Sequence, residues 1–296
     1  MRSVEAPKVA VVGLGRMGSA MARRFHDAGH DLVLWNRDRS KAEALAEDIG
    51  AGIASSPAIA AKDADVVVTS LADDDALADV YLGADGIASG IRADGVAVDT
   101  STVDPETVRQ VGAALSAVGA RFCDCPVSGS VSTVEAGTLT IMAGGEPEVV
   151  AAVEPVLSAI AQKVVRVGAL GSGAACKLAV NGLLHSFNVA LSEALVLAEK
   201  AGVDREAAYE VFASGAAGAP YVHYKREAFE YPEAAAVAFT LDLAAKDLEL
   251  ARKLGERVGA TLEQVTTTAA IVDEAIASGM GDRDLSAIAV YLRGES

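Results

Sequence analysis

A short glycine-rich segment near the start of the chain constrains the fold more than any other feature. The β-branched run that begins at Val9 meets glycine at Gly13, Gly15 and Gly18, and a helical pattern follows over residues 19–28. This order predicts a strand, a tight turn and a helix. The first glycine permits the turn, the second lets a pyrophosphate approach the backbone, and the third lets the helix pack on the strand. The helix N-terminus attracts the negative charge of the phosphates.

A second strand, predicted over residues 31–35, gives this pattern the context that dinucleotide binding requires. An acidic side chain at the end of that strand would accept hydrogen bonds from the adenosine ribose, but this chain has Asn36 and Arg37 there. A planar guanidinium suits a 2′-phosphate, so we expect NADP(H) to be favoured over NAD(H). NAD(H) stays possible because Asp38 follows directly. The alternative is that Arg37 is only a solvated turn residue.

Further apolar runs alternate with helical patterns and predict a largely parallel sheet with helices on both faces, an α/β doubly wound fold. Ligands of such sheets bind beyond the carboxyl ends of the strands, where Ser70, Ser101 and Thr102 lie. Residues 126–130 are predicted to form a turn with several free backbone N–H groups, suited to a carboxylate. The remaining predicted strands are residues 64–71, 96–100, 121–125, 138–143 and 164–167.

The pattern of the sequence changes after about Gly171, beyond which no strand is predicted. A long interdomain helix is predicted over residues 174–200, and 3.6-residue apolar spacing predicts further helices beyond it. We therefore expect a Rossmann domain over residues 1–171 and an all-α domain over residues 172–296. The later predicted helices are residues 204–214, 240–255, 262–278 and a short one after a polar turn at 281–284.

Two polar residues on the long helix are candidates for proton transfer. Lys177 and Asn181 lie four residues apart and therefore share one helix face, among small and apolar neighbours. Burial disfavours the charged form of a lysine, which brings it toward the range in which it both accepts and donates a proton. The alternative is a snorkelling lysine whose ammonium group reaches solvent.

The composition limits the classes of partner. A formal net charge of -16 argues against binding to nucleic acid or to an anionic membrane. The N-terminal residues 1–8 offer no apolar signal core, and no apolar run is expected to span a membrane, so a cytoplasmic protein is predicted. The cysteines Cys123, Cys125 and Cys176 are too few for a disulfide framework or a zinc site, and the histidines lack ligand spacing, so no metal is expected.

Taken together, the motifs resemble the β-hydroxyacid dehydrogenase family, 3-hydroxyisobutyrate dehydrogenase-like, over essentially the whole chain. Residues 36–37 and 98–102 are most similar to the NADPH-dependent glyoxylate and succinic semialdehyde reductases of that family. The resemblance implies a 6-phosphogluconate dehydrogenase-like C-terminal domain and a homodimer or homotetramer. The matching motifs are residues 13–18, residues 124–130 with 135–139, residues 171–177 with Asn181, and residues 246–248.

The resemblance also implies a role for each matched position. Lys177 would be the general acid and base, and Asn181 would orient the reacting oxygen. The substrate carboxylate would be bound by Ser128, Gly129, Ser130 and Lys246. Phe239 would lie against the nicotinamide, although a core phenylalanine is an alternative, and Asp247 would steady Lys246. The implied cofactor-binding residues are Gly13, Leu14, Gly15, Arg16, Met17, Gly18, Asn36, Arg37, Leu71, Thr102, Phe239 and Lys246.

The expected function is an NADP(H)-dependent interconversion of a small carboxylated aldehyde, a semialdehyde or glyoxylate, with its hydroxyacid. One alternative is an imine reductase, a class that usually replaces the lysine. Others are a 3-hydroxyisobutyrate or tartronate semialdehyde dehydrogenase that uses NAD, and a non-catalytic NADP-binding scaffold. Ser130 stands where many relatives have a second glycine, and Cys125 where they have alanine, so the motifs leave the substrate open.

Overall fold

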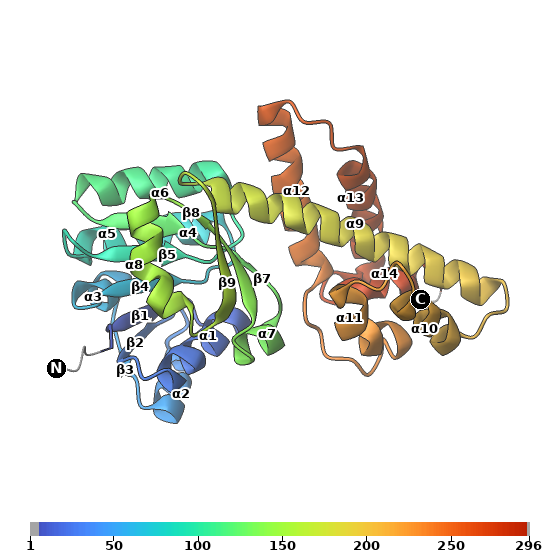
Figure 1. The fold of residues 1–296 in the computed structure, drawn as a ribbon, viewed down its shortest axis with the longest axis horizontal. Helices are drawn as coiled ribbons and strands as arrows, with labels where there is room; N and C mark the ends of the chain where they lie inside the picture. The colour runs from blue at the N-terminus through green and yellow to red at the C-terminus, as the bar shows by residue number, and fades with distance from the viewer. Residues whose placement is uncertain (1–5, 295–296) are drawn as a thin grey trace. The chain divides into compact units, whose positions relative to one another are not determined.

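The glycine-rich segment folds as predicted, into strand β1 (Val9–Val12), a tight turn and helix α1 (Arg16–Asp27) (Figure 1). The computed structural model describes residues 6–294, which divide after Lys177 into two compact units. The first five residues, on which the expectation of no signal segment partly rests, lie outside this range.

The first unit is a sheet whose order explains where a ligand can bind. The order is β3-β2-β1-β4-β5-β6-β8-β7, with β9 beside β8. The chain leaves β1 toward one edge and returns as β4 on the other side, so β1 and β4 flank the topological switch point. The strands after β1 are β2 (Leu32–Trp35), β3 (Gly52–Ile53), β4 (Val66–Thr69), β5 (Val96–Asp99), β6 (Arg121–Asp124), β7 (Val127–Ser128), β8 (Leu139–Gly144) and β9 (Ala161–Gly168).

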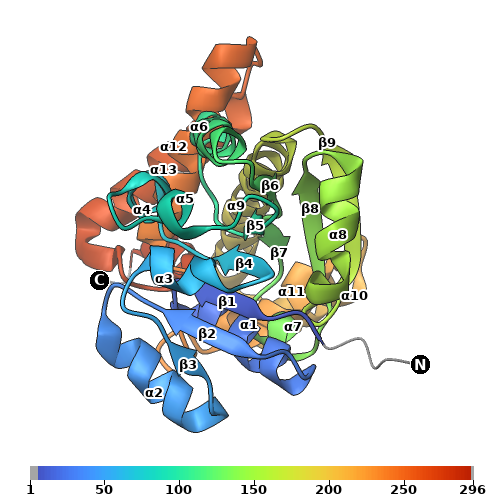
Figure 2. The same cartoon turned by 90° about the vertical axis from the view of Figure 1, so that its left-hand side faces the viewer.

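Pairing is parallel from β3 through to β6, whereas β8 runs antiparallel to β6 and to β7. The sheet is therefore largely parallel, as predicted, with an antiparallel portion. Helices cover both of its faces (Figure 2). The helices of this unit after α1 are α2 (Arg39–Ile49), α3 (Pro57–Lys62), α4 (Asp74–Leu82), α5 (Ile87–Gly90), α6 (Pro105–Ala117), α7 (Val131–Glu135) and α8 (Pro147–Leu157).

Alternate residues of the strands enter two different cores, which is why β1 is buried throughout. Val9 and Val11 pack with apolar residues of α1, α2 and α8, whereas Ala10 and Val12 pack with those of α3, α4 and α6. A strand that is buried on both faces reads as a continuous apolar run, which is the pattern seen in the sequence.

Helix α9 (Ser172–Lys200) begins in the first unit and continues into the second. It starts at Ser172 rather than at 174 as predicted. By length and hydropathy it also meets the criterion for a membrane span, contrary to our expectation, although 56% of its most apolar 18-residue window is buried inside the protein. A core helix passes the same test, so this is weak evidence for a membrane.

The second unit is all-helical. Residues of α9 contribute to three hydrophobic clusters here: one with α12, α13 and α14, one with α10 and α11, and a small one in which Leu178 packs on α12. Helix α11 was not singled out from the sequence. The predicted helix over 262–278 ends earlier, in a π-helical turn at Ile276–Met280 that contains Gly279 at a φ of 91°. The helices are α10 (Arg205–Ser214), α11 (Pro220–Glu230), α12 (Leu241–Val258), α13 (Glu263–Ala275) and α14 (Ile288–Arg293), the last after a 3-10 turn at Leu285–Ala287.

Candidate functional site

The connection from β1 into α1 requires glycine at two positions, one in the loop and one in the first turn of the helix. Gly13 has a φ of 93°, and a Cβ there would overlap the carbonyl oxygen of Ser70. A Cβ on Gly18 would overlap the carbonyl oxygen of Gly13. At Gly15, by contrast, a Cβ would meet nothing within 4 Å, so the backbone there is open to a ligand. Close packing behind the loop and an open front form a cradle that fits a pyrophosphate.

The start of α1 presents backbone N–H groups at this cradle. The first N–H groups of any helix lack intrahelical partners, and Gly15, the N-cap of α1, supplies no side-chain cap. Arg16 is exposed and Met17 half-buried in this first turn. The N–H of Leu14 is oriented differently, because it donates to Oδ1 of Asn36 at 2.9 Å. Asn36 therefore ties the loop to the end of β2.

Asp38, which weakens the sequence argument for NADP(H), caps the helix that follows it. Its carboxylate is the N-cap of α2 and accepts hydrogen bonds from the hydroxyl and the N–H of Ser40, at 2.7 and 3.2 Å. The bond from the Ser40 hydroxyl is the main cause that lowers the pKa of Asp38. Both bonds end on Oδ1 and hold the carboxylate against its own helix, while Arg37 beside it is exposed.

A small hollow of about 170 Å³ lies at the end of β2. Two arginines, Arg37 and Arg39, are among its lining residues, and the Arg39 Nε donates to Glu43 at 2.8 Å. Our sequence reasoning identified Arg37 but missed Arg39 and Ser55, since only the fold brings the end of β3 beside that of β2. The hollow is lined by Trp35, Asn36, Arg37, Arg39, Ala42, Ile53, Ala54 and Ser55.

A buried polar network joins the carboxyl ends of β4 and β5. Oδ1 of Asp99 accepts hydrogen bonds from the hydroxyls of Ser101 and Thr69, at 2.6 and 2.7 Å. The Ser101 hydroxyl oxygen in turn accepts from the N–H of Leu71 at 2.8 Å. Burial raises the pKa of Asp99 to about 6, against the effect of these hydrogen bonds. The network thus fixes the segments that carry Leu71 and Thr102, both predicted to contact the cofactor.

The predicted carboxylate-binding turn, residues 126–130, differs in part from expectation. Val127 and Ser128 form strand β7 and pair with β8, so only the following residues turn. Gly129 has a φ of 141°. The N–H of Ser130 is not free, because it donates to the Thr133 hydroxyl at 2.6 Å and thereby begins α7. The Ser128 side chain is half-buried and Gly129 is exposed, and these two stay available to a ligand.

Asp124, at the end of β6, holds the first turn of α9. Its Oδ1 accepts from the N–H of Gly171 at 2.9 Å, and its Oδ2 accepts from the N–H of Ala174 at 2.7 Å. Burial raises the pKa of Asp124 despite these bonds. A Cβ at Gly173 would lie 2.6 Å from the Asp124 carbonyl oxygen, so glycine permits this close approach. Lys177, half-buried, follows one turn along the helix.

In the second unit, Asn181 belongs to a buried polar cluster. Its Nδ2 donates to Oδ2 of Asp247 at 2.6 Å, and the two side chains are 3% and 2% exposed. The Asp247 Oδ1 pairs with the ammonium group of Lys246 at 3.2 Å. His185, four residues after Asn181, stacks on Phe239 with ring centroids 5.4 Å apart. The structure thus brings Asn181, Lys246 and Phe239 together around Asp247 and His185; sequence reasoning gave His185 no role here.

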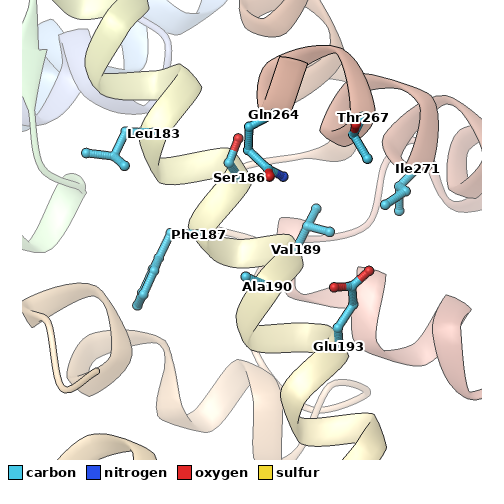
Figure 3. A pocket seen from close by; sticks show the side chains of 9 residues that line it. All are labelled: Leu183, Ser186, Phe187, Val189, Ala190, Glu193, Gln264, Thr267 and Ile271. Carbon is cyan, nitrogen blue, oxygen red and sulfur yellow. The ribbon is translucent and has the colours of Figure 1, made fainter. Parts of the chain in front are cut away.

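The second unit has a groove of about 400 Å³ between α9 and α13 (Figure 3). Leu183, Ser186 and Ala190 line it. At 100° per residue these three lie on the opposite side of α9 from Asn181 and His185. The groove is therefore separate from the polar cluster.

The cysteines and the possible metal ligands were also located in the structure. Cys123 in β6 and Cys125, which follows that strand, are buried with their sulfurs 3.7 Å apart. Within residues 6–294 no group of three or more histidine, cysteine or acidic side chains has the geometry to hold a metal ion.

The fold and the glycine cradle define the class of protein as a dinucleotide-binding protein of the Rossmann type. Residues 8–168 match the family model described as the NAD binding domain of 6-phosphogluconate dehydrogenase. Residues 171–292 match the model described as the NAD-binding region of NADP-dependent 3-hydroxyisobutyrate dehydrogenase. The expected fold class, an α/β doubly wound domain followed by an all-α domain, is confirmed.

Individual relatives span the chain almost completely. Chloroplastic glyoxylate/succinic semialdehyde reductase 2 of Arabidopsis thaliana is 33% identical over 96% of this chain and 79% of its own length. The solved 3-hydroxyisobutyrate dehydrogenase of Mycobacterium tuberculosis is 29% identical with a TM-score of 0.85, covering 97% of this chain and 99% of that one. The solved protein Psf3, in complex with NADP+ and 2-OPP, is 28% identical with a TM-score of 0.86, covering 96% and 99%. The chain belongs to the β-hydroxyacid dehydrogenase family.

Proposed function

We propose that this protein is an NADP(H)-dependent oxidoreductase that interconverts a small carboxylated aldehyde, a semialdehyde or glyoxylate, with its hydroxyacid. The observation that carries the proposal is the double hydrogen bond from Gly171 and Ala174 to Asp124. It ties the helical turn that leads to Lys177 to the strand that leads to Ser128. The proton-transfer lysine and the carboxylate turn are thus held on one rigid support, as catalysis requires.

The cofactor proposal rests on the cradle at Gly15 and on the hollow at the end of β2. When bound, NADP(H) would supply or accept a hydride. We infer that its 2′-phosphate is bound by Arg37, with Arg39 as a second cation at the same hollow. The capping role of Asp38 supports NADP(H) over NAD(H), because that carboxylate already accepts two hydrogen bonds. The named NADP+ complex of Psf3 supports it further.

The substrate proposal rests on residues 128–130. We infer that a carboxylate is bound by the Ser128 hydroxyl and by backbone at Gly129, with the Ser130 hydroxyl completing the turn. The Ser130 N–H makes no part of this binding, because it is committed to Thr133. We infer that Lys246, paired with Asp247 at 3.2 Å, contributes a cation for the anionic substrate. The names of the relatives, glyoxylate/succinic semialdehyde reductase and 3-hydroxyisobutyrate dehydrogenase, also indicate carboxylated compounds.

Proton transfer is assigned to Lys177. In the reducing direction its ammonium group donates a proton to the carbonyl oxygen of the substrate, and in the oxidising direction the neutral amine accepts the hydroxyl proton. Asn181 lies on the same face of α9. One N–H of its amide is used by Asp247, and the second N–H is free to donate to the oxygen on which negative charge develops.

Other functions that this fold supports would require different residues at key positions. An imine reductase would usually replace Lys177, and a non-catalytic scaffold would have no need of it. A dehydrogenase for 3-hydroxyisobutyrate or tartronate semialdehyde that uses NAD would need a free ribose-binding carboxylate, whereas Asp38 caps α2. Lys177 and Asp38 therefore favour the proposed function over these alternatives.

We also propose a cytoplasmic homodimer or homotetramer that pairs through its helical domain. Leu183 and Leu197 of α9 are 74% and 72% exposed, which is unusual for large apolar side chains. Size-exclusion chromatography with light scattering tests the oligomer, and a monomer at micromolar concentration would contradict it.

The deciding experiment measures initial rates of NADPH and NADH oxidation with glyoxylate, succinic semialdehyde, tartronate semialdehyde, methylmalonate semialdehyde and a cyclic imine. Turnover of a carboxylated aldehyde with NADPH preferred would support the proposal. A preference for NADH would overturn the assignment of Arg37 alone. Turnover of the imine only, or NADPH binding without any turnover, would favour the imine reductase or the scaffold.

A further inference from the structure

The His185 imidazole is buried without a hydrogen bond. The residue is 1% exposed, and neither ring nitrogen has a hydrogen-bond partner within residues 6–294. Burying polar nitrogens in this way is unfavourable, so it calls for a physical reason. A phenylalanine at this position would fill the same space without the penalty.

The nearest polar group gives that reason. His185 Nε2 lies 3.8 Å from Oδ2 of Asp247, the same oxygen that accepts the hydrogen bond from Asn181. This distance is about 1 Å longer than a hydrogen bond, so a small rotation of the ring would close it. The other carboxylate oxygen of Asp247 pairs with Lys246, whose side chain is 26% exposed. One buried carboxylate thus has an amide, an ammonium group and an imidazole around it.

One face of the imidazole is covered by an aromatic ring. His185 stacks on Phe239 with an angle of 29° between the ring planes. The backbone N–H of Phe239 donates to Asp284 at 3.2 Å, and Asp284 pairs with the buried Lys225 at 2.6 Å. The stack restrains the imidazole on one face, whereas the proposed approach of Nε2 to Asp247 is a rotation within the ring plane.

We propose that His185 is a positioning residue that replaces Lys246 as the partner of Asp247 when Lys246 turns to an anionic ligand. The imidazole N–H then donates to Asp247, which keeps that carboxylate, and with it the Asn181 amide, in place. Without such a replacement, departure of the ammonium group would leave a buried carboxylate with one partner fewer, which is strongly unfavourable. The proposal rests on the function proposed above, in which Lys246 binds the anionic end of the substrate.

Kinetics of three variants test the role in catalysis. His185→Phe keeps the aromatic stack and removes both nitrogens, His185→Gln keeps a donor, and His223→Phe is the matched control because His223 is exposed in the same unit. We expect His185→Phe to lower kcat roughly tenfold with the KM for NADPH unchanged, since one hydrogen bond to a charged group is lost. His185→Gln should recover most of the loss. Equal losses in the two His185 variants, or none in either, would overturn the proposal.

A measurement on the ligand-free protein is independent of activity. The variant Lys246→Met imitates departure of the ammonium group, and NMR of ¹⁵N-histidine-labelled protein reports the state of the ring, with His185→Phe identifying its signals. We expect Lys246→Met to shift the His185 ring signals to those of a hydrogen-bonded N–H, and the additional change Asp247→Asn to reverse the shift. His185 ring signals that stay at their wild-type positions in both variants would overturn the proposal. If the wild type turned over no aldehyde, the proposed function would fail while this measurement still decided the His185–Asp247 pair.

Discussion

The Ser101 hydroxyl donates a 2.6 Å hydrogen bond to the buried carboxylate of Asp99 and accepts one from the N–H of Leu71. The carboxyl ends of β4 and β5 are therefore held together through a group that titrates. Asp99 is 1% exposed, and burial is the main cause of its raised pKa of about 6.

This raised pKa predicts a pH dependence of stability. The folded state binds a proton at Asp99 more tightly than the unfolded chain, so stability from this group falls as pH rises from about 4 to about 6. Asp99→Asn removes the charge, and its Oδ1 still accepts from Ser101. We expect the variant to gain on the order of 2 kcal/mol over the wild type at pH 8 relative to pH 4. Urea unfolding of both proteins at the two pH values checks this, and parallel profiles would contradict it.

The glycine cradle predicts different outcomes at two positions. A Cβ at Gly15 meets no protein atom, so Gly15→Ala should keep the wild-type melting temperature and lose affinity for NADPH by blocking the pyrophosphate. A Cβ at Gly18 would overlap the Gly13 carbonyl, so Gly18→Ala should lower the melting temperature as well. Thermal unfolding and NADPH fluorescence titration separate the two effects. Unchanged NADPH affinity in Gly15→Ala would contradict the position of the pyrophosphate.

Cofactor preference should depend on the two arginines at the end of β2. Removing a charged hydrogen-bond partner of the 2′-phosphate costs roughly 1.5 to 3 kcal/mol, so Arg37→Ala should weaken NADPH binding about tenfold or more and leave NADH binding unchanged. Arg39→Ala should have a smaller effect of the same kind, since Arg39 also pairs with Glu43. Calorimetric titration with both cofactors tests this, with Arg252→Ala as control. Equal losses for NADPH and NADH would argue against 2′-phosphate binding.

How far the sequence predicts this molecule depends on the distance in the chain between interacting residues. Gly13 and Gly18 interact within one turn, and Lys177 and Asn181 share a face by helical spacing, so local pattern was enough to find them. Part of the segment that was predicted to be a carboxylate-binding turn is instead a strand, because Val127 pairs with Ile141. That pairing is non-local, and no periodicity within residues 126–130 indicates it.

The same limit applies to the polar cluster of the second unit. Asn181 and Asp247 are 66 residues apart in the chain, and only the packing of α9 on α12 brings them within 2.6 Å. From the sequence alone, His185 is indistinguishable from the other residues of an apolar helix, because its role depends on that packing. Asp124 belongs to a motif found in the sequence, but its role could not be predicted. Its partners are the backbone N–H groups of Gly171 and Ala174, which every residue type except proline has.

Asp124 should be required for the start of α9. Asp124→Ala would leave the N–H groups of Gly171 and Ala174 buried without their partner, at a cost of roughly 2 to 4 kcal/mol for the two bonds. We expect a clear drop in the urea midpoint and faster hydrogen exchange at residues 171–177. Glu106→Ala, an exposed acidic residue of α6, is the control. Exchange rates at 171–177 equal to those of the wild type would show that other contacts hold this turn.

Replacement of Lys177 separates proton transfer from every other role of this residue. Methionine has nearly the same length as lysine and no titratable group, so Lys177→Met should keep the helix and the fold. We expect turnover to fall by about two to four orders of magnitude, the range typical of losing a general acid, with NADPH affinity unchanged. Single-turnover rates and NADPH titration measure the two quantities, with Lys200→Met at the far end of α9 as the control. A variant that kept most of its turnover would exclude Lys177 as the acid, and one that lost NADPH binding in parallel would point to a structural role instead.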